Sequence, residues 1–358
     1  MRYASNATLM NNTLIPAMVA NSVGDTPTFP EQLTLMTNSS CNYRCRMCFQ
    51  EHHKDDEVSW GVVEKIGEVL PFVDTLQING GETFLYKRFL DLVALAGRTS
   101  TKVRLITNAS LMDAKVRHSL VENQVFNIKL SLDAATAKTY KHIRGGDFLK
   151  VVNNIAELTK LKKAVGSLYP ILEFNIVLMR ANIRELPRIL VLAQNLGIYQ
   201  VNFYYMHCTK EDWAHESLWF DQGLSDDTIA KTSEIAKTLG VNVTLPKPFK
   251  GAVLQETRVS TRCEEPWRSC LVGTRGELMP CCGGASSVGS LEEKDFNQLW
   301  NGPELIHLRK TVNTPDKPDF CKNCAGRMQD ERAIATHFRK DLIEKMEQGR
   351  LSHLRAAS

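Results

Sequence analysis

Short apolar runs alternate with longer helical patterns along residues 31–205. The apolar runs are rich in β-branched residues, as in buried strands, and occupy residues 32–37, 74–79, 102–107, 126–131, 171–179 and 200–205. The stretches between them space their apolar residues about 3.6 apart, as Val62, Ile66 and Val69 do, which predicts helices over 59–70, 86–99, 113–122, 147–165 and 183–196. Several of these patterns end near a glycine, such as Gly197.

Strands that alternate with helices predict parallel strands joined by right-handed crossovers. Only six repeats are visible, so we expect an α/β fold with an open, partial (β/α)6 TIM-like barrel rather than a closed barrel of eight. In barrels of this kind the chemistry sits at the carboxyl ends of the strands. The loops that follow the six strands are therefore the places to search for a site.

The strand–helix repeat ends after Tyr205. Residues 206–224 are irregular and rich in Trp, His and Asp, and a helix over 226–239 and a strand over 241–245 follow. From Pro246 the chain becomes rich in Gly, Pro and Cys. We therefore predict an N-terminal arm over 1–30, the barrel over 31–240, a small second domain over 241–330, and a C-terminal helix and tail over 331–358.

The composition of the chain limits which partners it is expected to bind and in which compartment it is expected to lie. The chain has 358 residues with a net charge of +4 and no block of like charge, so neither nucleic acid nor a membrane surface is an expected partner. No apolar run approaches the roughly 20 residues that span a bilayer, and no signal peptide is recognisable. We expect a cytoplasmic protein, in which clustered cysteines bind metal more often than they form disulfides.

Three cysteines, Cys41, Cys45 and Cys48, follow the first predicted strand within eight residues. Thiolates are the preferred ligands of iron–sulfur clusters, and a loop of this length can hold three corners of a four-iron cluster. The next cysteine is Cys208, far downstream, so one iron is expected to stay open for a substrate or cofactor. A structural zinc loop is the alternative, although no fourth ligand closes the set.

Polar groups also follow the next three strands. Gly80-Gly81-Glu82 combines a close backbone approach with a carboxylate that can accept bonds from an ammonium group. Thr107-Asn108 ends the third strand, and Ser131 and Asp133 end the fourth. Each signal has a plain alternative in a turn or a helix cap. Their order along four consecutive strands is what favours a shared site.

With these motifs the sequence resembles the radical S-adenosylmethionine (SAM) superfamily over about residues 30–330. The resemblance implies a [4Fe-4S] cluster on Cys41, Cys45 and Cys48 whose open iron binds SAM, and a flavodoxin- or ferredoxin-type electron donor. One electron then cleaves SAM to a 5′-deoxyadenosyl radical that removes hydrogen from substrate. The residues implied to contact the cofactor are Gly80, Gly81, Glu82, Asn108, Ser131, Asp133, Arg144 and Phe49. Met47, Thr83 and Ala109 depart from the residues usual in the family.

A second group of cysteines lies in the last third of the chain, with a plausible hairpin turn at Gly273–Gly276. The segment from Glu264 to Cys324 resembles the auxiliary-cluster domain called SPASM or, in its short form, twitch. That resemblance implies an auxiliary [4Fe-4S] cluster, for which we expect the ligands Cys263, Cys281, Cys321 and Cys324. Cys282 is an alternative to Cys281, and Cys270 is an alternative ligand or a free thiol. A structural zinc ribbon is the competing interpretation of the cysteine pairs.

The expected function is an oxidoreductase-like radical enzyme that abstracts hydrogen from a C–H bond of a small molecule. The outcome would be oxidation, dehydrogenation or epimerisation assisted by the auxiliary cluster. Cys208 is a candidate hydrogen donor, although a buried inert thiol is the commoner role of such a cysteine. A peptide substrate is the alternative; residues 1–30 are short for the recognition domain of peptide-modifying relatives. A non-catalytic zinc or iron–sulfur binding protein is the alternative of another class.

Overall fold

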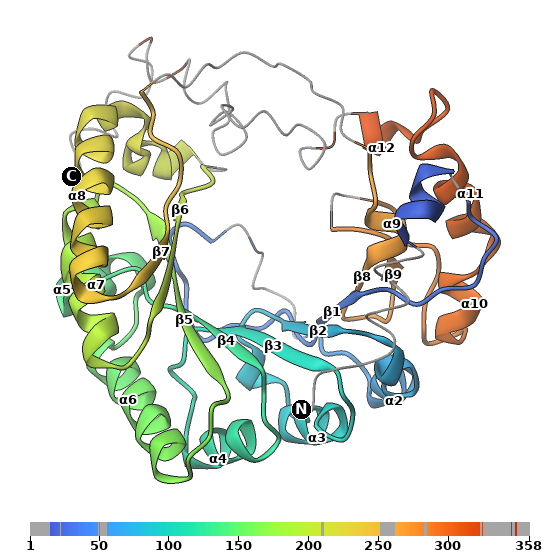
Figure 1. Ribbon diagram of the computed structural model, residues 1–358, viewed down its shortest axis with the longest axis horizontal. Coiled ribbons are helices and arrows are strands. Elements are labelled where there is room, and N and C mark those ends of the chain that lie inside the picture. Colours follow the sequence, from blue (N-terminus) through green and yellow to red (C-terminus); the bar gives the residue numbers. More distant parts are fainter. Residues whose placement is uncertain are drawn as a thin grey trace.

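One sheet organises the molecule (Figure 1). The structure, a computed structural model, describes residues 15–21, 23–48, 50, 56–208, 211–250, 262–282, 285–322, 324, 345 and 348. Within them the strand order is β7-β6-β5-β4-β3-β2-β1-β8-β9, and every neighbouring pair is parallel except β8 and β9. The strands are β1 (Gln32–Met36), β2 (Thr75–Asn79), β3 (Lys102–Thr107), β4 (Asn127–Ser131), β5 (Ile171–Leu178), β6 (Gln200–Tyr205), β7 (Asn242–Thr244), β8 (Ser269–Val272) and β9 (Leu278–Met279).

The sheet is curved, and its helices lie on the outer side (Figure 1). They are α2 (Trp60–Val69), α3 (Phe89–Ala96), α4 (Ala114–Glu122), α5 (Ala137–Arg144), α6 (Phe148–Ala164), α7 (Leu186–Asn195) and α8 (Gln222–Leu239). The expected open partial barrel is thus confirmed, because the strand order is linear and does not close on itself.

The two faces of the sheet differ sharply in polarity. Alternate residues such as Leu105, Ile128 and Phe174 are fully buried and form the main core. The residues between them, such as Arg104 and Lys129, are half-buried and polar. The helices therefore cover one face with apolar packing, and the inner face remains hydrophilic.

Helix α5 was missed in the sequence, where no helix was expected between residues 131 and 147. Thr136 caps it by accepting a hydrogen bond from the Thr139 backbone nitrogen, and Gly145 ends it in the left-handed conformation at φ 75°. Glu185 also accepts bonds from the hydroxyls of Thr136 and Thr139. This support comes from a residue distant in the sequence, which a local pattern does not reveal.

The C-terminal part adds strand β8 to the free edge of β1, with Leu33 opposite Cys270. The predicted turn at Gly273–Gly276 is confirmed, since it joins β8 to β9 with Gly276 at φ 72°. Four short helices complete this part: α9 (Glu265–Arg268), α10 (Phe296–Trp300), α11 (Pro303–Thr311) and α12 (Asp319–Lys322).

The described part of the predicted arm is packed rather than loose. Residues 15–20 are helical, and Ile15 and Val19 are buried. The Trp267 indole donates to the Val23 carbonyl oxygen at 2.8 Å, and the Trp300 indole donates to the Thr28 hydroxyl at 3.2 Å. The chain ahead of β1 therefore docks on the C-terminal helices, as Figure 1 shows in blue against orange.

Strand β7 pairs with β6 and so extends the barrel sheet, although residues 241–245 were expected to open the second domain. The division at residue 240 therefore cuts a hydrogen-bonded pair of strands. The predicted helix and tail over 331–358 lie outside the described residues, apart from residues 345 and 348. Among the described helices, none has the length and apolar character needed to cross a bilayer.

Asn182 fastens the loop after β5 to the end of β4. Its side chain is fully buried, donates to the carbonyl oxygens of Asp133 and Val177 at 2.8 Å each, and accepts from the Met179 backbone nitrogen at 2.9 Å. Water cannot reach this buried site. A backbone group that lost its bond to Asn182 would therefore have no other partner, which costs stability.

Replacing Asn182 with alanine should lower the free energy of unfolding by about 3 kcal/mol, because three buried backbone groups lose their partner. Denaturant unfolding measures the change. Asn195→Ala, at an exposed position of α7, is the control and should change it by less than about 0.5 kcal/mol. Equal effects of the two variants would contradict the role given to Asn182.

Candidate active site at the carboxyl ends of the strands

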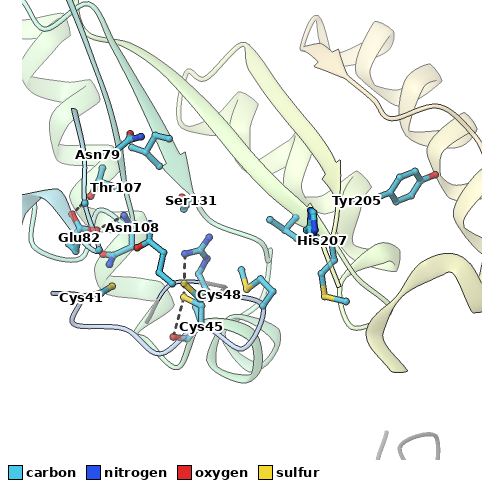
Figure 2. A pocket seen from close by; sticks show the side chains of 18 residues that line it. Cys41, Cys45, Cys48, Asn79, Glu82, Thr107, Asn108, Ser131, Tyr205 and His207 are labelled. Carbon is cyan, nitrogen blue, oxygen red and sulfur yellow. Dashed lines mark hydrogen bonds between the residues drawn. The ribbon is translucent and has the colours of Figure 1, made fainter. Parts of the chain in front are cut away.

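A cavity of about 440 Å³ opens where the carboxyl ends of β2 to β6 meet the loop after β1. Figure 2 shows three cysteines of that loop on one side of the cavity and the strand-end residues around them. The predicted residues that line it are Cys41, Cys45, Cys48, Gly80, Gly81, Glu82, Asn108, Ser131 and Arg144. The structure therefore brings together motifs that lie up to a hundred residues apart in the sequence.

The cysteine loop is held against the Gly-Gly-Glu loop by backbone hydrogen bonds. The Gly81 nitrogen donates to the Asn38 carbonyl oxygen at 3.0 Å, and the Glu82 nitrogen donates to the Ser40 carbonyl oxygen at 2.9 Å. A Cβ atom on Gly81 would lie 2.3 Å from that Ser40 oxygen. Only glycine permits this approach, so the Gly81 signal in the sequence reflects contact between the two loops.

Three further contacts fix the rest of the cysteine loop. The Arg46 nitrogen donates to the Ile143 carbonyl oxygen of α5 at 3.0 Å. The Asn108 side chain donates to the Asn42 side chain at 3.1 Å. Tyr43 is buried and packs edge-on against Tyr140, 6.4 Å between ring centres. The loop is thus attached to β3 and α5 as well as to β2.

Glu82 is buried, and its carboxylate is held by three donors. The Thr107 hydroxyl donates at 2.6 Å, the Asn108 backbone nitrogen at 2.8 Å and the Phe84 backbone nitrogen at 3.3 Å. Burial raises the pKa of the Glu82 carboxyl, while these bonds act in the opposite direction. Oε1 accepts two of these bonds and Oε2 accepts one, so Oε2 keeps acceptor capacity that suits an ammonium group in the cavity.

Arg144 links a buried carboxylate to a cysteine of the loop. Its Nη2 lies 2.5 Å from Asp133 Oδ2, and its Nη1 donates to Cys45 Sγ at 3.6 Å. Burial disfavours the charged guanidinium, but Asp133 and Cys45 outweigh burial and raise the pKa of Arg144. Arg144 therefore stays cationic beside the thiol, and its Nε is buried without an acceptor.

The donor set fits an iron–sulfur cluster. Three thiols converge on one cavity, and burial raises the pKa of Cys41 to about 11 and also raises the pKa of Cys45. Buried thiols of this kind lose their protons when a metal centre supplies the positive charge. The unpartnered Arg144 Nε adds a donor suited to sulfur or a carboxylate of a bound group.

Two predicted residues are placed away from the cavity, and a third is not described. Asp133 is fully buried and does not line the cavity; it accepts from the Val177 nitrogen at 2.6 Å and pairs with Arg144. Cys208 is buried and is also absent from the cavity lining. Phe49 lies outside the described residues. Asp133 thus orients Arg144, although the resemblance implied that Asp133 contacts the cofactor.

Several lining residues were not singled out from the sequence, notably Asn79, Ile106 and Val177. These three are the last inward-facing positions of β2, β3 and β5, so strand alternation was the signal that could have found them. At the end of β6, Met206 and His207 line the cavity, whereas Asn202 and Tyr204 do not. Figure 2 shows the Tyr205 ring pointing away from the cysteines.

The C-terminal cysteines occupy one unit of the fold. Cys263 precedes α9 and is tied to Asn313 by two hydrogen bonds of 2.8 and 3.0 Å. Cys281 follows β9, while Cys321 lies in α12 with Cys324 just after it. Among the described residues, no three His, Cys, Asp or Glu side chains are arranged to hold a single metal ion. The four-cysteine ligand set of the auxiliary cluster stays a prediction.

Two other cysteines in this part were left open in the sequence. Cys270 is buried within β8, and burial raises its pKa. Cys282 is exposed. Cys270 is therefore an inert interior thiol, whereas Cys282 is open to solvent.

Comparison with known families agrees with both groups of cysteines. Residues 36–193 match the radical SAM superfamily, and residues 263–325 match an iron–sulfur cluster-binding domain called SPASM. Members of these families bind SAM and [4Fe-4S] clusters. The first match includes the three clustered cysteines, and the second includes all four expected ligands of the auxiliary cluster.

Individual relatives are distant. A cofactor-modifying protein for tungsten-containing aldehyde ferredoxin oxidoreductase from Pyrococcus furiosus is 28% identical over 176 residues, 46% of this chain and 49% of that protein. This chain thus spans about half the length of that relative. The subtilosin biosynthesis protein AlbA of Bacillus subtilis is 21% identical over 325 residues, 83% of this chain and 67% of that protein.

A solved structure shares the fold. Streptococcus suis SuiB bound to its precursor peptide SuiA superposes with a TM-score of 0.62 at 15% identity, covering 85% of this chain and 71% of that chain. The likeness extends over the barrel and beyond it, so the arrangement of the two parts follows a known architecture.

Replacing Gly81 with alanine should strongly reduce cluster incorporation, because the new Cβ would push the Ser40 backbone and displace the cysteine loop. Iron content and visible absorption after anaerobic reconstitution measure the effect. Gly223→Ala is the matched control, since a Cβ there meets nothing within 4 Å, and it should bind iron as the wild type does. Full iron loading of Gly81→Ala would refute the close-approach argument.

Proposed function

Because residues 36–193 form a radical SAM domain and residues 263–325 a SPASM iron–sulfur domain, we propose that this protein is a radical SAM enzyme that abstracts hydrogen from a small molecule. The observation that carries the proposal is the cavity that joins three thiols to Glu82, Asn108 and Arg144. The reaction we favour is oxidation, dehydrogenation or epimerisation at a C–H bond.

Cys41, Cys45 and Cys48 are the proposed ligands of a [4Fe-4S] cluster with one open iron. When bound, the cluster and SAM supply a 5′-deoxyadenosyl radical through reductive cleavage, with the electron coming from a flavodoxin- or ferredoxin-type donor. Every other contribution comes from the protein side chains that bind, orient and shield the cofactor.

The side chains of the cavity suit the charged ends of SAM. The Glu82 carboxylate is oriented by three donors and can accept bonds from an ammonium group. Arg144, held by Asp133, supplies a cation for a carboxylate. Ser131 lines the cavity and offers a hydroxyl for the ribose. Because these groups are pre-positioned, little ordering is needed when the cofactor binds.

Two classes of substrate have support. The cavity measures about 440 Å³, and the inner-face residues that precede its lining on the strands are polar, as Gln77 and Lys129 are, which suits a small hydrophilic molecule. One relative is named for modifying a cofactor, which also favours a small molecule. The alternative is a peptide, favoured by the likeness to AlbA over 83% of the chain.

We propose that Cys263, Cys281, Cys321 and Cys324 would hold an auxiliary [4Fe-4S] cluster, which would supply an acceptor for an electron from the substrate radical. Cys282 is the alternative to Cys281, and its exposure leaves it accessible to a cluster or to solvent. A quenching thiol would give epimerisation. Cys208 is a weaker candidate for that thiol than the sequence suggested, because it does not line the cavity. A non-catalytic zinc or iron–sulfur protein is the alternative of another class.

Reduced, reconstituted protein should convert SAM to 5′-deoxyadenosine, and Cys45→Ala should not, while keeping the iron of the auxiliary cluster, about half of the wild-type content. Chromatography of the nucleoside and iron analysis measure both. Lys115→Ala, at an exposed position of α4, is the control and should retain activity. A colourless protein that holds zinc after anaerobic reconstitution would support the non-catalytic alternative and refute the enzyme.

The substrate class can be tested with deuterium. Metabolites and peptides from cells grown in heavy water are separated by ultrafiltration and offered to the reduced enzyme with SAM. Abstraction from a labelled C–H position makes 5′-deoxyadenosine heavier, which mass spectrometry detects. We expect the heavier product with the small-molecule filtrate. Its appearance with the peptide fraction alone would replace our proposal with the peptide alternative.

A further inference from the structure

The inner face of the sheet forms successive rows below the cavity. Asn79, Ile106 and Ser131 line the cavity from β2, β3 and β4. Figure 2 shows Asn79 and Ser131 on the strands beside the cysteine loop. The next residues on the same face, two positions earlier on each strand, are Gln77, Arg104 and Lys129. A ligand that fills the cavity therefore reaches these side chains next.

Carboxylates near this row are already engaged. Glu173 of β5 lies opposite Lys129 in the sheet, but its oxygens accept from the side chains of Asn127 at 2.9 Å and Asn202 at 3.1 Å. Asp74 pairs with Lys102 at 3.0 Å. Asp74 is thus neutralised by Lys102, whereas Glu173 is held by two neutral amides and forms no ion pair among the described residues.

Arg104 and Lys129 are two cations left over from this network. Among the described residues, neither forms an ion pair, and Lys129 makes no hydrogen bond through its side chain. The Arg104 guanidinium carbon lies 5.5 Å from the centre of the Phe126 ring, and its Nε is buried without an acceptor. A buried N–H without a partner is costly, so a missing acceptor is the simplest account of this arrangement.

The two cations lie close to each other and to the cavity. Lys129 lies opposite Ile106 in the β3–β4 pair, and Arg104 lies two residues before Ile106 on the same face. Neighbouring strands are about 5 Å apart, so the long side chains reach a common point. Asn79 adds a donor, because its oxygen accepts from Gln77 at 3.0 Å and its amide nitrogen is left to face a ligand.

We propose that Arg104 and Lys129 bind an oxyanion of the substrate, a phosphate or a carboxylate, on the inner face of the sheet. This inference rests on the proposed function for the identity of the ligand as substrate. An anion held there places the rest of the molecule toward Ile106 and Ser131, and so toward the cysteine loop. The site thereby selects small molecules that carry negative charge and fixes which end enters first.

The chemistry of the pair suits such a ligand. A guanidinium presents parallel N–H donors that match two oxygens of a phosphate or carboxylate, and an ammonium adds a point charge. Partial burial on the inner face weakens screening by water and strengthens both contacts. A neutral substrate would leave both cations unpaired in the filled site.

The test is isothermal titration calorimetry on the reconstituted protein with SAM and without reductant. Inorganic phosphate and sodium succinate are titrated separately at constant ionic strength, so that the two arms distinguish a phosphate from a carboxylate. We expect at least one of them to bind. Arg104→Gln and Lys129→Gln should each weaken that binding about tenfold or more, the usual effect of losing a charge-assisted bond.

Matched controls remove the same charges elsewhere. Arg98→Gln and Lys115→Gln change exposed residues on the helix side and should leave binding unchanged. Arg104→Lys and Lys129→Arg keep the charge and should bind more tightly than the glutamine variants, which separates a lost anion site from a disturbed fold. The inference is overturned if the wild type binds neither anion, if the glutamine variants bind like the wild type, or if the controls lose as much.

Failure of this inference is distinguishable from failure of the proposed function. The titrations involve no reductant and no turnover, so they report on the anion site alone. Formation of 5′-deoxyadenosine by the wild type, measured separately, reports on radical chemistry. Turnover without anion binding would support the proposed radical SAM activity and refute the anion site. Anion binding without any turnover would support the anion site and refute the proposed activity.

Discussion

The close approach of two backbones, at Ser40 and Gly81, is the contact on which the site depends. It lets the loop after β1 lie directly on the loop after β2, where the Glu82 nitrogen donates to the Ser40 carbonyl oxygen. Any side chain larger than hydrogen would separate them. The contact holds the thiols at one end of the sheet and sets Glu82 at the edge of the same cavity.

The two faces of the sheet have different roles. Its outer face is apolar and buried under the helices, which provides the stability of the molecule. Its inner face carries amides and charges, and it leads from the cavity down the strands. A barrel filled with apolar side chains would leave no room for a polar ligand, and the hydrophilic inner face suits the charged small molecule that we propose as substrate.

Much of the architecture could be predicted from local signals. Each of the six predicted strands of the barrel was found, for example 171–179 as β5, because buried parallel strands leave continuous β-branched runs. The cysteine loop, Glu82 and Asn108 were also placed correctly, since each follows the end of a strand, whereas Arg144 was named only through the family resemblance. Helix α5 was missed, because Glu185 supports it from a distant segment.

By itself, the sequence determined the strand–helix alternation, the thiol spacing of Cys41, Cys45 and Cys48, and the glycine that lets two loops touch. These are local properties, which depend on the periodicity and the types of neighbouring residues. The tertiary structure alone decided that Asp133 holds Arg144 and does not face the cavity, that β8 extends the sheet beside β1, and that Arg104 and Lys129 remain unpaired. Partners of that kind come from segments far apart in the chain, so only the folded arrangement brings them within reach of each other.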